Sequence, residues 1–180
     1  MIKPKIFQVN GTEYTIRPAK VSDAPALAEL RLQIDGETEH FDRVQGEGLI
    51  DEGEFKELIL LDTSIPNHLF LVAEVEGNLV GFSRCEGSHL KRLKHQVEFG
   101  VGVIKEFWGL KIGQALLSQS ILWAHHQGLV KMTLKVIETN KSAIYVYKKY
   151  EFEIEGILKK HKRLSDGHYY NTLIMSRFFS

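Results

Sequence analysis

The stretch WGLKIG, residues 108–113, could bind a phosphate group, because it places two glycines at the start of a predicted helix. The first N–H groups of a helix have no partner within the helix and attract anions. Gly109 and Gly113 lack the Cβ atom that would keep phosphate oxygens away from such groups. The stretch is therefore a candidate pyrophosphate-binding loop. A tight turn between a strand and a helix would use the same glycines, and both interpretations remain open.

Two common phosphate-binding motifs do not match this sequence. A Walker A loop requires Lys followed by Ser or Thr after its last glycine, whereas Gly113 is followed by Gln114. The dinucleotide-binding motif requires a third glycine, and Lys105 occupies that position after Gly100 and Gly102. Neither type of nucleotide site is therefore predicted.

Histidine and carboxylate side chains could ligate a metal ion, but their spacing does not indicate a site. His125 and His126 are adjacent, so on a helix they point in different directions and cannot easily hold one ion. Segment 35–53 is acidic, contains glycine and is weakly periodic, which predicts a loop. Its acidic cluster with one histidine comprises Glu37, Glu39, His40 and Asp42. We expect no metal site, and a solvated surface loop is one interpretation of this segment.

The composition excludes several classes of protein. Lys plus Arg and Asp plus Glu both total 23, so the formal net charge is zero, which argues against a general nucleic-acid-binding protein. The single cysteine, Cys85, cannot form an intrachain disulfide. The first residues lack the apolar run of a signal peptide, and no stretch approaches the ~20 apolar residues that span a membrane. We expect a cytoplasmic protein without a membrane or nucleic-acid partner.

The hydrophobic pattern predicts the elements that must position the candidate residues. Strands are predicted at 13–19, 68–76, 79–86, 95–104 and 130–137, and in a hairpin over 152–179 that turns at Asp166-Gly167. Helices are predicted from the possible N-cap Ser22 to Ile34, at about 53–62, at 112–127, and at 140–150 with Asn140 as the possible N-cap.

Hairpins alternate with strand–helix–strand crossovers in this order of elements. The clearest hairpin joins its strands through Gly77-Asn78. Two glycines, Gly100 and Gly102, lie inside the strand 95–104, which indicates a bulge or a close approach of another backbone. The order predicts an α/β (α+β) fold with a mixed sheet and helices on its faces.

Two longer stretches together resemble one enzyme family. VGVIKEFWGLKIGQALL, residues 101–117, is similar to the acetyl-CoA-binding motif of the GNAT N-acetyltransferases. NKSAIYVYKKYEFEIEG, residues 140–156, resembles a later motif of the same family. The resemblance covers about residues 12–178 and is nearest to the branch of ribosomal-protein and spermidine acetyltransferases. It implies a single GNAT domain over 12–180, with a twisted, mostly antiparallel mixed sheet of about seven strands and about four flanking helices.

The resemblance implies transfer of an acetyl group from acetyl-CoA to a primary amine of a small molecule or peptide, by direct attack. An amine with a pKa near 10.4 is almost fully protonated at neutral pH, so a base is useful. Glu98 is our candidate base, and its neighbours Val97 and Phe99 should face the other way. A surface glutamate with no chemical role is the alternative, with an ordered water as the base.

The resemblance also implies a proton donor and a set of contacts to the acetyl-CoA arm. Tyr147 matches the motif tyrosine and is the candidate donor to the leaving thiolate, although its helical spacing alone fits a core tyrosine. The Val101 amide would polarise the thioester. The candidate cofactor-binding residues are Val101, Gly102, Val103, Trp108, Gly109, Leu110, Lys111, Ile112, Gly113, Asn140, Ala143 and Tyr147.

Two residues depart from the family pattern. Lys111 and Glu151 stand where the family usually has a small residue, Gly or Ala at the first position and Gly at the second. If the second position is left-handed, glutamate costs about 1 kcal/mol relative to glycine. Neither departure removes a group that the chemistry needs.

The acceptor and the assembly are less well defined by the sequence. In this family the segment between the first two helices shapes the acceptor pocket, and the acidity of 35–53 would suit a cationic amine such as a polyamine. A homodimer is possible within the family. A non-catalytic acyl-CoA-binding protein with the same fold, and a transferase of a longer acyl group, are the alternatives to the proposed activity.

Overall fold

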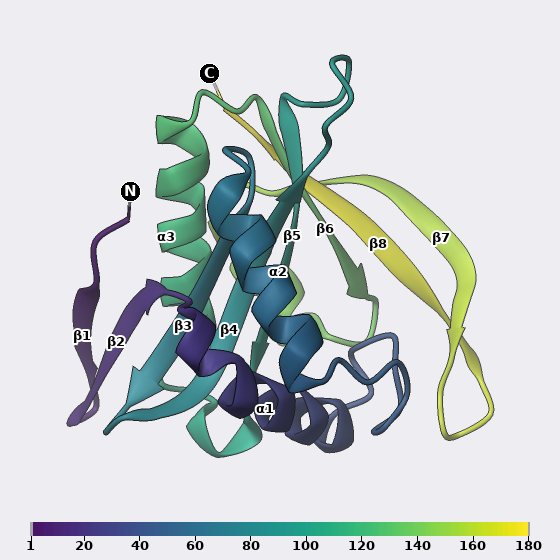
Figure 1. The fold of residues 1–180 in the computed structure, drawn as a ribbon. Coiled ribbons are helices and arrows are strands. Elements are labelled where there is room, and N and C mark those ends of the chain that lie inside the picture. Colours follow the sequence, from purple (N-terminus) through teal and green to yellow (C-terminus); the bar gives the residue numbers. More distant parts are fainter. Residues whose placement is uncertain (1, 180) are drawn as a thin grey trace.

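One sheet organises the molecule. The structure is a computed structural model that describes residues 2–179, and Ser180, the last residue of the predicted domain, lies outside them. Within residues 2–179, eight strands form a sheet in the order β1-β2-β3-β4-β5-β6-β8-β7 (Figure 1). The strands are β1 (Lys5–Val9), β2 (Thr12–Pro18), β3 (Leu69–Val75), β4 (Asn78–Gly87), β5 (Gln96–Val103), β6 (Lys131–Ile137), β7 (Glu153–Arg163) and β8 (Tyr169–Phe178).

The pairing of the strands confirms the predicted mixed sheet. Strands β5 and β6 run parallel, while the other neighbouring strands are antiparallel. The parallel pair is connected through α3, as a parallel connection requires a crossover. The candidate binding loop, which precedes α3, therefore belongs to the crossover that connects β5 to β6.

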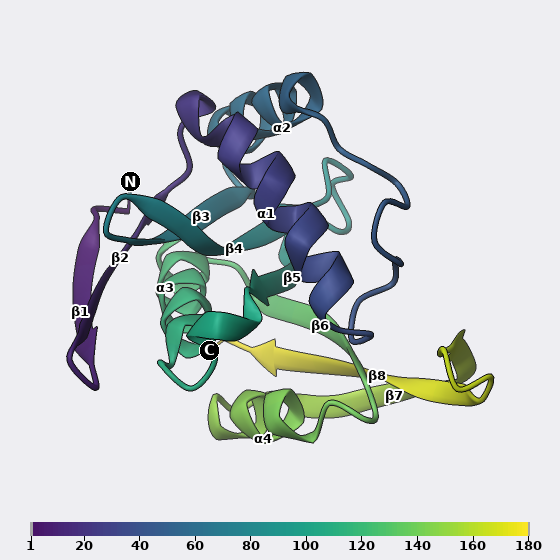
Figure 2. The same ribbon diagram turned by 90° about the horizontal axis from the view of Figure 1, so that it is seen from below.

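Helices cover both faces of the sheet. They are α1 (Ala24–Glu37), α2 (Glu52–Ser64), α3 (Ile112–His126) and α4 (Lys141–Lys149), with short 3₁₀ turns at Val21–Asp23 and Lys105–Phe107. Figure 2 shows α1 and α2 on one face and α3 and α4 on the other. Strand β3, with the sequence LFLVAEV, is buried at almost every position, because a strand covered on both faces needs apolar side chains on both.

The structure corrects several local predictions. Ser22 does not cap α1: it lies within the 3₁₀ turn, and Asp23 is the residue that precedes the helix. Asp23 accepts hydrogen bonds from Arg17 at 2.7 Å and from the Lys20 N–H at 2.7 Å, which fix the chain entering the helix. Helix α1 also continues to Glu37, so the first residues of the predicted loop 35–53 are helical.

Two further differences concern strands and turns. The sequence analysis did not predict β1, which pairs with β2 at the edge of the sheet. The β3–β4 hairpin turns at Glu76 and Gly77, whose φ angles of 48° and 81° are left-handed, rather than at Gly77-Asn78. This turn matches the twist of the strands because both of its residues have positive φ.

Candidate active site

Strands β5 and β6 separate partway along their length. Their register runs from Gln96 opposite Lys131 to Glu98 opposite Thr133, where it ends. Beyond that point, β5 continues to Val103 paired with β4 alone. The side of β5 that faces away from β4 therefore has peptide groups without a neighbouring strand.

The pattern of hydrogen bonds identifies those peptide groups. The Ile104 N–H donates to the Val80 carbonyl at 3.0 Å, which sets the alternation of the β4–β5 ladder. In an antiparallel ladder, alternate residues bond to the partner strand and the others point away. The N–H and C=O groups of Val101 and Val103 therefore face the opening. The Trp108 indole donates to the Val103 carbonyl at 2.8 Å, so Val101 is the residue of this pair with both its N–H and its C=O free at the opening.

The predicted bulge in β5 is absent from its register with β4, which is continuous over 97–103. The other prediction, close approach of another backbone, does not describe Gly102 either, because its near neighbours are side chains. A Cβ atom there would lie 3.2 Å from Ile34 Cδ1 and 3.6 Å from Phe41 Cζ. Gly100 has open space instead, with nothing within 4 Å of a Cβ atom. Of these two glycines of β5, Gly102 is therefore the one at which a Cβ atom would require its neighbour to shift.

The loop before α3 has the geometry of an anion-binding helix start. The Ala115 N–H donates to the Lys111 carbonyl at 2.9 Å, the bond that closes the first turn of the helix. The N–H groups of Ile112, Gly113 and Gln114 precede that bond and have no partner within the helix. Lys111 has a φ of 59°, so a lysine takes the left-handed conformation at the position where the family usually has a small residue.

One cavity of about 440 Å³ collects the predicted cofactor-binding residues. It extends from the free edge of β5, past the start of α3, to the first turns of α4. All of the predicted cofactor-binding residues line it except Leu110, which packs against the core. The Leu110 backbone remains a predicted contact, since a binding loop needs only the backbone at that position.

Tyr147 lines this cavity from α4. Its ring packs against Phe152, with centroids 5.8 Å apart. Burial raises the pKa of Tyr147 to about 12, with no charge or hydrogen bond contributing to the shift. The hydroxyl is therefore protonated across the physiological range and can donate a hydrogen bond into the cavity.

Asn140 performs the N-cap role predicted for it. Its Oδ1 accepts hydrogen bonds from the Ala143 N–H and the Ser142 hydroxyl, both at 3.2 Å. The side-chain amide N–H groups are not needed for the cap. The same residue can therefore start α4 and contact a ligand in the cavity.

Glu98, the candidate base, does not line the cavity that contains Tyr147. Its neighbours Val97 and Phe99 are buried, which confirms the predicted alternation, and Glu98 itself lines a second cavity of about 940 Å³. Lys135 Nζ donates to both of its carboxylate oxygens, at 3.0 and 3.3 Å. Three residues of strand separate Glu98 from Val101, or about 10 Å. Glu98 can therefore act on a reacting group near Val101 only through intervening water.

The two cavities meet at Phe41, Val101 and Gly102, which line both. Phe41 belongs to the loop after α1, and the sequence analysis did not single it out. That segment has no periodicity, so its only signal was an aromatic residue within an acidic loop. Phe41 therefore stands at the junction where two ligands, one from each cavity, would meet.

The acidic cluster contacts other parts of the chain. Glu37 accepts from the Lys105 N–H at 2.6 Å, Glu39 accepts from the Ser165 N–H at 2.8 Å, and Asp42 pairs with Lys162 at 2.7 Å. The contacts of Glu39 and Asp42 connect the loop to the β7–β8 hairpin, whereas that of Glu37 connects the end of α1 to the 3₁₀ turn at Lys105–Phe107. The three carboxylates line a third cavity, between the loop and that hairpin, and are not among the residues around Glu98.

Two negative findings hold for residues 2–179, the part of the chain that the structure describes. No group of three or more His, Cys, Asp or Glu side chains in that range is arranged to hold a metal ion. No helix in the same range is both long and apolar enough to cross a membrane.

Comparisons with known proteins agree with this geometry. Residues 35–152 match the family model described as "Acetyltransferase (GNAT) family". A curated relative, the L-amino acid N-acetyltransferase AaaT of Escherichia coli, is 34% identical over 108 residues, which cover 59% of this chain and 66% of the relative. The chain thus spans slightly less than two thirds of that relative's length.

Solved structures share the fold at low sequence identity. An acetyltransferase of the GNAT family from Streptococcus pneumoniae has a TM-score of 0.89 at 24% identity, covering 92% of this chain and 99% of that one. A GNAT superfamily phosphinothricin acetyltransferase from Sinorhizobium meliloti, solved in complex with acetyl-CoA, has a TM-score of 0.82 at 21% identity, covering 93% and 89%. The predicted fold class is confirmed.

Proposed function

Since the chain belongs to the acetyltransferase (GNAT) family, we propose that it transfers the acetyl group of acetyl-CoA to a primary amine of a small molecule or peptide by direct attack. One observation carries the proposal: the free peptide group of Val101 and the unpaired N–H groups at the start of α3 line the same cavity. A free strand edge suits the amide-containing pantetheine arm, and a helix start suits a pyrophosphate. The name of the curated relative, an L-amino acid N-acetyltransferase, supports a small-molecule amine.

The residues present fit acetyl-CoA as co-substrate. The cavity is lined by apolar side chains, including Ala143 and Val146, with donors concentrated at the start of α3. Lys111 adds a positive charge beside those donors. The Val101 N–H would pair with the arm and polarise the thioester carbonyl, where negative charge develops as the amine attacks.

Proton transfer then assigns roles to two side chains. The acceptor is an ammonium at neutral pH and attacks only as the neutral amine, so Glu98, acting through water from the second cavity, accepts the proton that the nitrogen loses before the attack. The Tyr147 hydroxyl donates to the sulfur as the carbon–sulfur bond breaks, so the thiolate leaves with its charge stabilised. The amine nitrogen gains the acetyl carbon and loses a second proton, the sulfur gains the proton of Tyr147, and the proton lost by the nitrogen restores the tyrosine through solvent, so no further reactant is required.

Thermal unfolding with acetyl-CoA tests the first half of the proposal. Ligand at 100 times its dissociation constant adds about 2.7 kcal/mol, which raises the melting temperature by several degrees for a domain of this size. Release of free thiol in the presence of amines tests the second half. Stabilisation without thiol release would identify a non-catalytic acyl-CoA-binding protein, and faster turnover with a longer CoA ester would identify a different acyl donor. No stabilisation by acetyl-CoA or CoA would contradict the proposal.

A further inference from the structure

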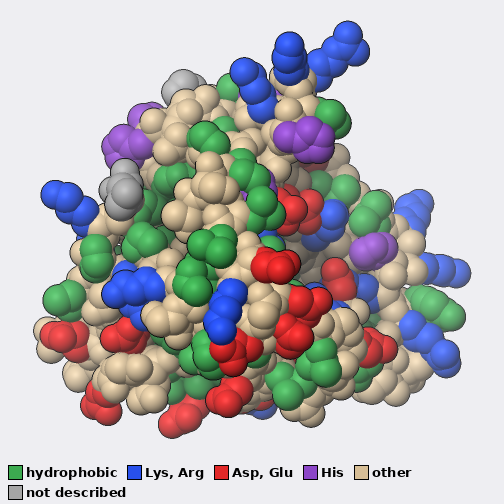
Figure 3. Space-filling model, viewed as in Figure 1, with side chains coloured by type: hydrophobic (Ala, Val, Ile, Leu, Met, Phe, Trp, Pro, Cys, Tyr) green, Lys and Arg blue, Asp and Glu red, His purple; other side chains and the backbone are tan. Residues whose placement is uncertain are grey.

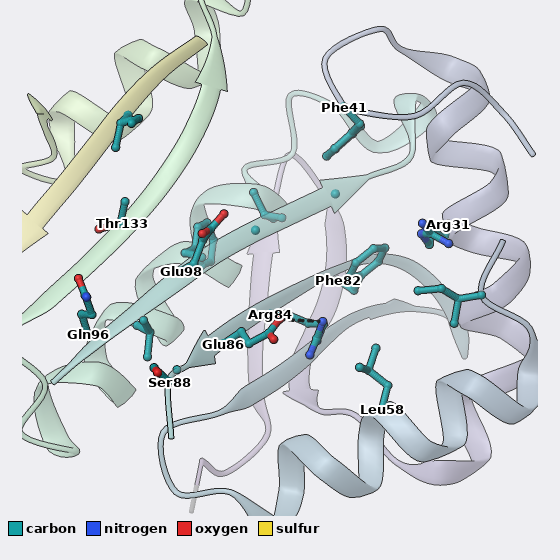
Figure 4. Close-up of a pocket in the computed structure, with 18 of the residues that line it drawn as sticks. Arg31, Phe41, Leu58, Phe82, Arg84, Glu86, Ser88, Gln96, Glu98 and Thr133 are labelled. Carbon is teal, nitrogen blue, oxygen red and sulfur yellow. Dashed lines mark ion pairs between the residues drawn. The ribbon is translucent and has the colours of Figure 1, made fainter. Parts of the chain in front are cut away.

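The second cavity, which contains Glu98, has a mixed lining. Figure 3 shows a hollow on this face in which acidic side chains and a Lys or Arg side chain lie close together. Figure 4 shows side chains from α1, α2, β4 and β5 around it, with Phe82 and Arg84 between Glu98 and Arg31. Apolar side chains complete the wall, namely Ile34, Phe41, Ile50, Phe55, Leu58 and Phe82. The cavity can therefore hold a small molecule that has both charged and apolar parts.

Most charges in this wall are neutralised by a close partner. Three pairs involve one carboxylate and one cation each: Lys131 with Glu155 at 2.7 Å, Lys135 with Glu98 at 3.0 Å, and Arg84 with Asp62 at 2.7 Å. Arg84 also lies 3.6 Å from Glu86, which is largely exposed to solvent. Because each of these cations already has a close carboxylate partner, it should attract an anionic ligand only weakly.

Asp35 is the carboxylate between the two remaining arginines. Arg43 binds it through two hydrogen bonds, from Nε at 3.1 Å and from Nη2 at 3.2 Å. This bidentate contact occupies both carboxylate oxygens in the arrangement that arginine prefers. Arg31 reaches the same carboxylate only at 3.9 Å, beyond hydrogen-bond distance.

Arg31 is consequently the cation of this wall with the weakest partner. Only 9% of the residue is exposed, yet its one hydrogen bond runs from Nη1 to the Gly48 carbonyl at 2.6 Å. A guanidinium has five N–H donors, so most of its capacity is unused. Burial and the neighbouring Arg43 lower the pKa of Arg31, although the nearby carboxylates Asp35 and Glu54 act in the opposite direction. Buried charges are normally paired, because an uncompensated one is costly.

We propose that Arg31 binds a carboxylate of the acceptor, so that the substrates are amines that also carry a carboxylate, such as amino acids. The inference rests on the proposed function. It differs from the polyamine expectation, because the carboxylates of the acidic cluster lie around another cavity and Arg31 supplies a cation here.

The position of Arg31 suits a small acceptor of this kind. Arg31 and Ile34 are three residues apart on α1, which places their Cβ atoms about 5–6 Å apart on one face of the helix. Ile34 in turn contacts Gly102, at the junction of the two cavities. One helical turn of α1 therefore separates Arg31 from the residue that contacts the junction, where the amine must meet the thioester.

Matched acceptors test this inference. The value of kcat/KM is measured for L-amino acids and for their α-amides, which keep the amine and lose the carboxylate charge, and for spermidine. The wild type should prefer the acids, and Arg31→Gln should reduce the ratio of acid to amide by about 10- to 100-fold, the usual effect of losing a charge-assisted hydrogen bond. Because one pair of acceptors is compared in two proteins, differences in amine reactivity cancel.

Control variants separate recognition from folding. Arg31→Lys keeps the charge without the planar fork and should retain part of the acid preference. Lys131→Met removes a cation from the same wall that is already paired with Glu155, and should leave the ratio unchanged. The melting temperature and the acetyl-CoA affinity of each variant show whether it is folded. If Arg31→Gln is not folded, the acid-to-amide ratio of kcat/KM in Arg31→Lys tests the role of Arg31 instead.

The outcomes distinguish this inference from the proposed function. Acetyl transfer that shows no preference for acids, or that loses acids and amides equally in Arg31→Gln, would overturn the role of Arg31 and leave the acetyltransferase intact. Acetyl transfer to spermidine but to no amino acid would also overturn the role of Arg31 and leave the acetyltransferase intact. Absence of both acetyl-CoA binding and transfer would overturn the proposed function itself.

Discussion

Lys135 Nζ lies 3.0 Å from Glu98 Oε1, and the pair bridges the place where β5 and β6 separate. Glu98 is the last residue of β5 in register with β6, and Lys135 lies two residues beyond its partner Thr133. The candidate base is therefore positioned at the opening, with its carboxylate occupied by an ammonium group. Its distance from Val101 makes a water relay part of any role it has.

Replacement of the carboxylate tests that role directly. Glu98→Gln should lower kcat by about 10²- to 10⁴-fold, the usual contribution of a general base, and flatten the acidic limb of the pH–rate profile. Glu86→Gln is the matched control, because Glu86 lines the same cavity from β4. A pH profile unchanged in Glu98→Gln would assign the proton transfer to water alone.

Tyr147→Phe should lower kcat while acetyl-CoA affinity remains close to that of the wild type, because the ring stays in the cavity and only the donor is lost. Tyr145→Phe is the control on the same helix, since Tyr145 is 72% exposed. Equal losses in turnover and in affinity would make Tyr147 a packing residue.

The raised pKa of Tyr147 adds a pH dependence that can be measured. Burial favours the neutral phenol, so its contribution to stability is complete below the ordinary pKa of 10.0 and is lost as the pH rises toward about 12. Alkaline unfolding between these limits should therefore weaken in Tyr147→Phe, which has no phenol to ionise. Identical alkaline unfolding in the two proteins would show that this group does not contribute.

The sequence predicted the elements well where local patterns decide them, and less well where long-range packing does. Three features are set within a few residues, and each was predicted. They are the start of α3 at the WGLKIG stretch, the alternation around Glu98 and the Asn140 cap. Strand β1 was missed, because its exposed edge position gives it no clear alternation of burial. The turn at Glu76 was misplaced by one residue because a left-handed glutamate is uncommon.

The candidate site shows the same division. The cofactor side is formed by two continuous segments, so the motifs alone brought its residues together. The acceptor side combines α1, α2, β4 and β5, and no local pattern indicates that Arg31 and Glu98 line one cavity. Nor could the sequence show that Arg43, rather than Arg31, occupies Asp35.

Lys111 and Glu151 both have left-handed backbones, and their substitution by glycine should give different results. Lys111→Gly should raise the free energy of unfolding by about 1 kcal/mol, because glycine adopts this conformation without a Cβ penalty. Glu151 pairs with Arg177 at 2.6 Å, so Glu151→Gly gains the same term and loses about 0.2–1 kcal/mol from the ion pair. Urea unfolding measures both.

The charge of Lys111 can be separated from its backbone by a second variant. Asparagine tolerates the left-handed region but carries no charge, so Lys111→Asn isolates the electrostatic contribution to acetyl-CoA binding. Both Lys111→Gly and Lys111→Asn should bind acetyl-CoA more weakly than the wild type, with a smaller difference at high salt. Unchanged affinity in both would place the lysine outside the phosphate contacts.

Gly102 and Gly100 form the most direct test of the cavity junction. In Gly102→Ala the new Cβ meets Ile34 Cδ1 at 3.2 Å, so we expect a loss of about 1 kcal/mol or more in the free energy of unfolding and lower activity as Ile34 shifts at the junction. Gly100→Ala places its Cβ in open space and should be neutral or slightly stabilising. Ile34→Val removes the Cδ1 atom that causes the contact, so Gly102→Ala should cost less stability in that background. The double-mutant cycle measures this coupling, and additive effects would show that the α1–β5 contact does not shape the junction.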